Sequence, residues 1–397
     1  MYRKIERSLV AGDEHGVFIE RISLKLKNEK KMKKTYIVIP ALNPPEKFYD
    51  YLAAINEVEG LYTVVVNDGS RAEFEPLFSK IKTLSKTRVL THAVNQGKGA
   101  ALKTAFAFLR EQGEKDIRIV CADCDGQHKV KDIIRIARET GVRPGTLVLG
   151  ERQFSGGRTP WKSRLGNRVS SLMFYLSGGV WVGDTQTGLR GFDGSLLPVL
   201  LSIPGQRFEY EMQVLLYCME HHYPIHMMNI ETVYEDGNKS THFRPVQDSV
   251  QIMGVLMKPL LKFLSSSVGC AAFDMILFLL LHQYLSRTLY LPDARAVFAA
   301  TGCARACSVG LNYLINRKYV FSSDEKERRF RKGSGIRYAA LCIAVALSSA
   351  AGIYFVQSLV PVPAGIAKVL VDSLLFLVSY QVQKKWVFSK CEVRYEI

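Results

Sequence analysis

Short apolar runs alternate with amphipathic segments between residues 36 and 230. The apolar runs end in polar or turn-forming residues and predict strands at 36–40, 62–68, 88–93, 117–123 and 146–151. Apolar positions between them, as in 97–113 and 130–141, have helical spacing. This alternation predicts an α/β domain over 35–242, with a mostly parallel, Rossmann-like sheet. Ligands of such domains bind at the carboxyl ends of the strands.

The hydrophobic pattern changes after residue 242. An amphipathic helix is predicted at 243–262, with apolar residues on one face and Lys258 and Lys262 on the other, as suits a membrane surface. Four apolar stretches follow at 263–285, 296–316, 338–360 and 364–383, each with the ~20 residues that a helix needs to cross a bilayer. Four such lengths in succession favour an all-α transmembrane domain over 263–390 rather than buried core helices.

The distribution of charge supports a membrane protein. The 397-residue chain is 48% hydrophobic and has a formal net charge of +16. Most of the excess lies in 1–34, 317–337 and 384–397, and two of these segments border apolar runs. Such placement encodes membrane topology, whereas a nucleic-acid partner would require basic residues spread along a groove. We expect a multi-pass protein of the cell membrane, with the α/β domain and both termini in the cytoplasm.

The N-terminal segment is assigned no role in binding or catalysis. Residues 1–34 are charged and lack the apolar core of a signal peptide, so they predict a mobile segment, with Met32 as an alternative start.

The eight cysteines form no disulfide framework. Cys121 and Cys124 form a single C-x-x-C without the second pair that a zinc site needs. We therefore interpret the cysteines as reduced, small apolar residues.

Carboxylates gather at the predicted strand ends. Asp123 ends the strand 117–123, and Asp125 follows two residues later. Both carboxylates can reach one Mg²⁺ or Mn²⁺ ion that also holds phosphate oxygens, although a D-x-D alone is equally typical of a solvated turn. Asp68 ends a strand at the same edge and is placed to bind a base or ribose. Gly97 and Lys98 begin the next helix, as a wall of a nucleotide site or as an ordinary helix cap.

Seven motifs occur in a fixed order between residues 35 and 240: VIPALNPP, VNDGS, NQGKGAAL, ADCDGQH, GERQFSGGR, WKSRLGNR and DTQTGLRGF. In this order they resemble the inverting family 2 glycosyltransferases with a GT-A fold. The most similar branch contains dolichol-phosphate mannosyltransferase and the bacterial undecaprenyl-phosphate glucosyltransferases. ARACSVGLNYLINRKYVF (304–321) and its echo SYQVQKKWVF (379–388) resemble the GtrA-like four-helix membrane family.

The resemblance implies a role for each matching residue. The implied nucleotide-binding residues are Pro40, Ala41, Asn43, Asp68, Gly97, Lys98 and Asp123, and the implied metal ligands for Mg²⁺ or Mn²⁺ are Asp123, Asp125 and Gln127. The implied catalytic residues are Asp125, Arg152, Arg164, Arg190, Glu209 and Glu211, of which Arg152 and Arg164 match the pair expected to hold a lipid phosphate. The chain departs from the family pattern at Leu42-Asn43-Pro44, where Tyr-Asn-Glu is usual, and this leaves the identity of the base open.

These observations predict a membrane-bound enzyme that moves a hexose from a nucleotide sugar, with UDP-glucose the first choice, to undecaprenyl phosphate. Its product would serve cell-wall or surface polysaccharide glycosylation. Two alternatives stay open: a lipid-linked sugar translocase or scaffold with a nucleotide-sugar-binding domain, and transfer to a non-lipid acceptor. A homo-oligomer is also left open. Within the predicted spans, we expect Asp274 or Asp372 to pair with Arg305, because isolated charges are costly there.

Overall fold

A computed structural model of the chain describes residues 34–114, 116–152, 161–178, 181–231, 245–288, 292–321, 333–360 and 362–388. The predicted mobile segment 1–34 lies outside the described residues except for Lys34. Contacts divide the chain into two compact units, Met1–Val255 and Leu256–Ile397. The division falls inside one long helix.

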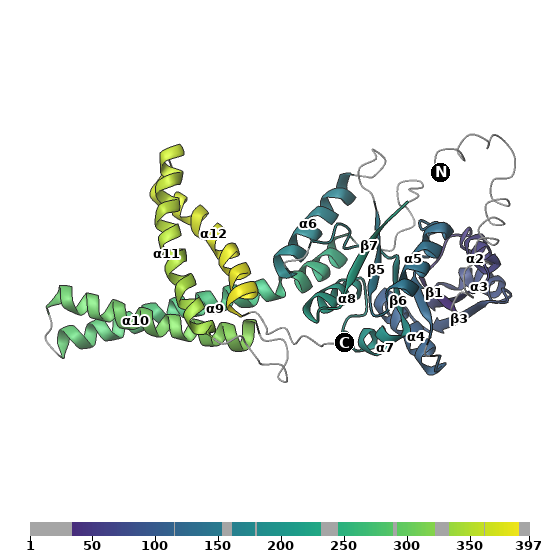
Figure 1. Cartoon of the computed structure of the whole chain (residues 1–397), viewed down its shortest axis with the longest axis horizontal. Helices are drawn as coiled ribbons and strands as arrows, with labels where there is room; N and C mark the ends of the chain where they lie inside the picture. The colour runs from purple at the N-terminus through teal and green to yellow at the C-terminus, as the bar shows by residue number, and fades with distance from the viewer. Residues whose placement is uncertain are drawn as a thin grey trace. The chain divides into compact units, whose positions relative to one another are not determined.

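A seven-stranded sheet forms the centre of the first unit, in the order β3-β2-β1-β4-β6-β5-β7. Figure 1 shows this sheet among the helices of the unit. Its strands are β1 (Thr35–Ala41), β2 (Leu61–Asp68), β3 (Thr87–His92), β4 (Arg118–Cys121), β5 (Leu147–Arg152), β6 (Arg190–Asp193) and β7 (Ile225–Ile230). Strand β6 is antiparallel to β4 and β5, and the other pairs are parallel. The predicted mostly parallel, Rossmann-like GT-A sheet is confirmed, and the antiparallel insertion is an addition to it.

Helices cover the sheet and leave its carboxyl edge for loops. One buried core joins β1 residues Ile37 and Ile39 to apolar side chains of α2 (Phe48–Glu57), α3 (Glu75–Ile81) and α5 (Val130–Val142). Successive strand residues point to opposite faces. Helix α4 (Lys98–Glu111) contacts β1 and β2 and also packs on α7 (Leu197–Ser202) and α8 (Glu209–Glu220). The remaining elements of this unit are η1 (Ala72–Phe74), α6 (Trp161–Gly178) and η2 (Gly194–Leu196).

The second unit is helical. It contains most of α9 (Pro245–Arg287), followed by α10 (Asp293–Ile315), η4 (Asn316–Val320), α11 (Ser334–Leu359), α12 (Ala364–Val382) and η5 (Gln383–Val387). Three stretches among the described helices are long and apolar enough to cross a membrane: Gln247–Arg287, Ser334–Leu359 and Gly365–Val387. The predicted span 296–316 is helical as α10, but it is not one of the three. Its composition includes Arg305, Ser308 and Asn312.

The predicted interfacial helix and the first predicted span form a single helix. Helix α9 continues for 43 residues from Pro245 to Arg287, with no break at residue 262. Pro259 lies inside it and lacks the amide hydrogen that would bond one turn earlier, but the flanking residues stay helical. Amphipathic patterning therefore located a helix here correctly and did not locate its end.

The charged side chains of the predicted spans are paired. Arg305 Nη2 lies 3.3 Å from Asp274 Oδ2, so Asp274 is the partner of Arg305. Asp372 instead lies 2.8 Å from Lys368 Nζ, one turn earlier on α12, and accepts a hydrogen bond from Ser349. These pairs limit the cost of placing ionised groups in apolar helices.

Candidate active site

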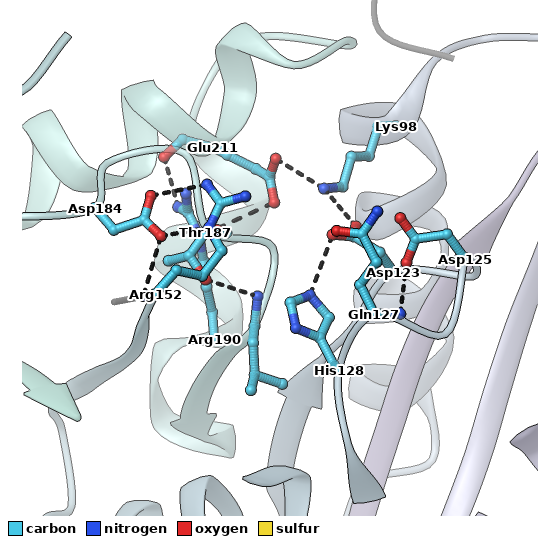
Figure 2. Close-up of polar contacts among 11 residues, drawn as sticks. Lys98, Asp123, Asp125, Gln127, His128, Arg152, Asp184, Thr187, Arg190 and Glu211 are labelled. Carbon is cyan, nitrogen blue, oxygen red and sulfur yellow. Dashed lines mark hydrogen bonds and ion pairs between the residues drawn. The ribbon is translucent and has the colours of Figure 1, made fainter. Parts of the chain in front are cut away.

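Lys98 links the half-buried carboxylate of Asp123 to the buried carboxylate of Glu211 at the carboxyl edge of the sheet. Its Nζ lies 2.8 Å from Asp123 Oδ1 and 3.0 Å from Glu211 Oε2, as Figure 2 shows. Lys98 is the first residue of α4, Asp123 follows β4, and Glu211 lies in the first turn of α8. The other Asp123 oxygen, Oδ2, lies 3.2 Å from His128 Nε2. Three chain segments therefore meet at Lys98: the start of α4, the loop after β4 and the first turn of α8.

The charges of this cluster stabilise one another. Burial lowers the pKa of Lys98, but the charges of Asp123 and Glu211 outweigh burial and raise it above its ordinary value. Burial likewise raises the pKa of Asp123, but Lys98 and His128 outweigh burial and hold it well below its usual range. Lys98 and Asp123 are therefore an ion pair at neutral pH.

Asp125 differs from Asp123 in its surroundings. Its Oδ1 accepts a hydrogen bond of 3.0 Å from the Gln127 backbone N–H. Burial and the nearby charge of Asp123 raise the pKa of Asp125, so a cation beside it would relieve this repulsion. The oxygen donors of Asp123, Asp125 and Gln127 suit a hard divalent cation. No group of three or more His, Cys, Asp or Glu able to hold a metal occurs in the part of the chain described, so phosphate oxygens or water would complete the coordination.

The C-x-x-C cysteines are free thiols. Burial raises the pKa of both the Cys121 and the Cys124 thiol to about 12. A thiolate is the form that binds zinc, and at neutral pH both groups are thiols. This agrees with their interpretation as small apolar residues.

A second charged pair lies at the end of β5. Arg152 Nε donates to Asp184 Oδ2 at 2.6 Å, and Arg152 Nη2 donates to Asp184 Oδ1 at 3.0 Å (Figure 2). Asp184 is fully buried, and its Oδ1 also accepts from the Gln186 backbone N–H. Arg164, the other arginine of the predicted phosphate-binding pair, lies exposed on α6.

Segment 184–189 runs from this pair to the carboxylate of Asp123. A Cβ atom placed on Gly188 would lie 2.3 Å from Asp123 Oδ2, so only glycine allows this approach. Arg190, buried just after the segment, donates to the carbonyl oxygens of Thr187 at 2.9 Å and Glu211 at 2.6 Å. Its guanidinium therefore fixes the segment against α8. This geometry suits a supporting role for Arg190.

The two predicted glutamates have different surroundings. Glu211 contacts Lys98 and lies within the cluster. Glu209 Oε1 accepts hydrogen bonds from the backbone N–H groups of Gln206 and Arg207, and so closes the turn before α8. Of the two, only Glu211 lies in the charge cluster that Figure 2 shows.

Asp68 holds the loop that leads to Lys98. Its Oδ1 accepts from the Gln96 N–H at 2.9 Å and its Oδ2 from the Gly97 N–H at 2.8 Å. Oδ1 also lies 2.7 Å from His92 Nδ1, and His92 Nε2 lies 2.9 Å from Thr104 Oγ1 on α4. Gly97 has a φ of +102°, a conformation that favours glycine. The predicted base-binding carboxylate is thus engaged by the protein itself.

The remaining predicted nucleotide-binding residues follow β1. Pro40 and Ala41 are buried at the end of this strand. Asn43 has a positive φ of 41°, and its backbone N–H donates to Ser70 Oγ while its Oδ1 accepts from the Arg71 N–H. These bonds connect the β1 loop to the loop after β2, and both lie at the carboxyl edge.

Two family models match the chain. Glycosyl transferase family 2 matches residues 36–194, and the GtrA/DPMS transmembrane domain matches residues 262–388. The chain carries a family 2 glycosyl transferase domain and a GtrA/DPMS transmembrane domain. This protein is a membrane glycosyltransferase, and the charge cluster around Lys98 lies in its transferase domain.

Curated relatives match the transferase domain. An uncharacterised protein of Methanocaldococcus jannaschii is 25% identical over 217 residues, which cover 54% of this chain and 87% of that protein. The UDP-N-acetylglucosamine–dolichyl-phosphate N-acetylglucosaminyltransferase of Methanococcus voltae is 26% identical over 220 residues, which cover 51% of this chain and 86% of that enzyme.

Solved structures with a similar fold include glucosyl-3-phosphoglycerate synthase from Mycobacterium tuberculosis. Its complex with Mn²⁺, UDP and glucosyl-3-phosphoglycerate is 16% identical, with a TM-score of 0.43, and the match covers 62% of this chain and 86% of that one. Its complex with Mg²⁺ and UDP is 17% identical, with a TM-score of 0.42 and coverage of 60% and 82%.

Three residues of the transferase site were not predicted: His92, His128 and Asp184. His128 lies in the motif ADCDGQH with Asp123, and Asp184 lies in the motif DTQTGLRGF with Gly188. Each is a polar residue of a motif found in the sequence, and this could have identified it as a site residue. His92 ends a strand like Asp68, and the register pairs these two residues across β2 and β3. A prediction of the strand order, with β2 next to β3, would have identified that contact.

Proposed function

We propose that this glycosyltransferase moves a hexose from a nucleotide sugar, with UDP-glucose the first donor to test, to the phosphate of undecaprenyl phosphate. The proposal rests on two charged groups that lie in one site, the carboxylates of Asp123 and Asp125 and the Arg152–Asp184 pair (Figure 2). Asp123 and Asp125 suit the metal and diphosphate of the donor, and the Arg152–Asp184 pair suits the phosphate of the acceptor.

The donor side is supported by the carboxylates after β4. Asp125 and Gln127, with Asp123 beside them, would hold Mg²⁺ or Mn²⁺. The ion would neutralise the charge that develops on the departing nucleoside diphosphate. Lys98 holds Asp123 in place through its ion pair, and Asp68 orients the loop before Lys98.

The acceptor side is supported by Arg152. A guanidinium can hold a phosphate through two hydrogen bonds, and Asp184 fixes the orientation of this one. The acceptor phosphate is already anionic at neutral pH, since its second pKa is about 6. Its oxygen forms the new bond to the anomeric carbon while the bond from that carbon to the diphosphate breaks, with inversion. No strong general base is required, and catalysis reduces to positioning.

An exposed apolar face on α6 favours a lipid acceptor. Leu165, Val169 and Leu172 follow helical spacing and are 53%, 39% and 46% exposed. Trp181, just beyond the helix, is 54% exposed and packs on Tyr175. The sequence of α6 contains basic residues, Arg164 among them, and no acidic residue. Such a face suits the boundary of a bilayer with anionic headgroups, where a polyprenyl phosphate presents its phosphate.

The choice of substrates has further support. The Methanococcus voltae relative is named for transfer from UDP-N-acetylglucosamine to dolichyl phosphate, which makes UDP-N-acetylglucosamine the second donor to test. The basic segment 317–337 favours a cytoplasmic transferase domain by the positive-inside rule, on the side where nucleotide sugars are made. The product would then supply cell-wall or surface polysaccharide glycosylation.

Release of nucleoside diphosphate tests the proposal. Purified full-length protein is incubated with a panel of nucleotide sugars and Mg²⁺ or Mn²⁺, with and without undecaprenyl phosphate. We expect release with one donor, dependent on both lipid and metal, and its loss in Asp125→Ala but not in the control Asp50→Ala on α2. Folded protein that releases no diphosphate with any donor would overturn the proposal and favour a translocase or scaffold. Release without lipid would point to a non-lipid acceptor.

A further inference from the structure

The membrane domain contains two matching turns. Asn316-Arg-Lys-Tyr-Val-Phe321 follows α10, and Gln383-Lys-Lys-Trp-Val-Phe388 follows α12. Each combines an amide, two cations, an aromatic residue, valine and phenylalanine. Each folds as a π-helical turn, closed by a backbone bond of 3.0 Å from Phe321 N to Asn316 O and of 2.8 Å from Phe388 N to Gln383 O. Helical turns of this rare type are frequent at functional sites.

The two turns contact each other through buried groups. Asn316 Nδ2 donates to Gln383 Oε1 at 3.1 Å, and the rings of Phe321 and Phe388 stack with centroids 5.1 Å apart. Both amides are buried, and Ser266 of α9 donates to Asn316 Oδ1 at 2.7 Å. The amides therefore hold the two turns together as a local pair, and each amide is followed directly by two cations.

The cations beside this pair are held near the surface. Arg317, Lys318 and Lys385 are exposed, and Lys384 is half-buried. Arg337, at the start of α11, donates to the Trp386 carbonyl oxygen at 3.1 Å and lies over the Trp386 ring. Five cations thus surround the paired turns.

Exposed aromatic residues accompany the cations. Tyr319 is 59% and Trp386 is 44% exposed, and each belongs to one of the two turns. Tyrosine and tryptophan favour the headgroup level of a bilayer, and cations there attract anionic lipid. A phosphate-binding site open only to water has no need of large exposed aromatic rings.

We propose that the paired turns form a binding site for the phosphate of an anionic membrane lipid, with Arg317 and Lys318 on one side and Lys384 and Lys385 on the other. This site belongs to the second unit, whereas the sugar-transfer residues belong to the first, and it does not depend on the proposed reaction. Phosphatidylglycerol, whose phosphate has no compensating cation, is the lipid to which we commit.

Lipid retention by the full-length protein tests this site. Wild-type protein in detergent is titrated with phosphatidylglycerol, and bound lipid is counted by native mass spectrometry. At about 1 kcal/mol for each cation near a membrane surface, Lys318→Gln/Lys385→Gln is expected to weaken binding roughly tenfold or more. Lys318→Arg/Lys385→Arg keeps the charge and should retain binding. The matched control Arg287→Gln/Arg295→Gln removes two cations at the opposite helix ends and should change binding less than about twofold.

Three results would overturn the proposal. Unchanged binding in the Lys→Gln pair would show that the turns do not hold the lipid. Equal weakening in the control pair would show an effect of net charge. Displacement of the lipid by millimolar inorganic phosphate would show a site for phosphate in solution.

Discussion

Asp184 grips Arg152 through two hydrogen bonds, and the two side chains differ in exposure, because the carboxylate is fully buried whereas the guanidinium is 20% exposed. The pair therefore presents a cation of fixed orientation at the edge of the site. We expect Asp184→Asn to lower kcat/KM for the lipid acceptor roughly tenfold, because the guanidinium loses its bidentate partner. The free energy of unfolding should fall by about 1–3 kcal/mol. Kinetics with varied acceptor and urea unfolding measure the two effects.

Arg110→Gln on α4 is the control for this change and should leave both quantities unaltered. A rise in the KM for the nucleotide sugar, with no change for the acceptor, would assign the Arg152–Asp184 pair to the donor side.

The buried Lys98 cation lies between the carboxylates of Asp123 and Glu211, and its removal should lower the stability of the protein. Lys98→Met leaves Asp123 and Glu211 facing each other without their shared cation. Breaking a buried ion pair from one side costs about 3–5 kcal/mol, and we expect a loss of this size in the free energy of unfolding. Urea titration measures it, with Lys82→Met at an exposed position as a control expected to change stability by less than about 0.5 kcal/mol.

A double variant refines this test. Lys98→Met/Glu211→Gln removes one of the unpaired charges, so it should be more stable than Lys98→Met alone. Additive losses from the two substitutions would contradict the coupling.

His92 supports the loop before α4 through Asp68. His92→Phe removes the contacts to Asp68 and to Thr104, both within 3 Å. Two lost buried hydrogen bonds should cost about 2–3 kcal/mol. The backbone amides of Gln96 and Gly97, which donate to Asp68, should exchange with solvent faster, as hydrogen–deuterium exchange would show. His226→Phe, at a partly exposed position on β7, should leave those two amides unchanged.

The exposed face of α6 offers a test of membrane contact. Leu172→Glu places a charge on a face that we propose meets the bilayer. Burying a leucine contributes about 1.5–3 kcal/mol, so the KM for a long-chain polyprenyl phosphate in vesicles should rise roughly tenfold or more. Val142→Glu, at the exposed end of α5, is the matched control. Equal effects on a short, water-soluble acceptor would argue for a folding defect in place of lost lipid contact.

Much of the transferase fold is evident from the sequence. Apolar runs that end in polar residues identify β1, β2 and β4, because parallel strands are buried on both faces and have a continuous apolar signature. The same signal places Asp68 and Asp123 at the carboxyl edge. Lys98 and Asp123 were each predicted to bind the nucleotide, but their ion pair was not predicted, since it depends on how α4 packs.

Other features depend on contacts between distant segments. Strand β6 has four residues and begins with the charged Arg190, so it gives no apolar run to detect. The guanidinium of Arg190 is buried because carbonyl oxygens of Thr187 and Glu211 receive it, and no local pattern encodes those partners. Likewise, residue types matched Glu209 to an active-site position, but its hydrogen bonds close the turn before α8.

The antiparallel strand β6 also has a consequence for the order in which the protein is made. It lies between β4 and β5, both of which precede it in the chain, so the sheet cannot close until residues 190–193 have been synthesised. Lys98 gains its second carboxylate partner later still, when Glu211 of α8 becomes available. Long-range pairing of this kind slows folding. The emerging chain therefore holds an open sheet edge, and the charge cluster around Lys98 is completed only shortly before the first membrane helix follows.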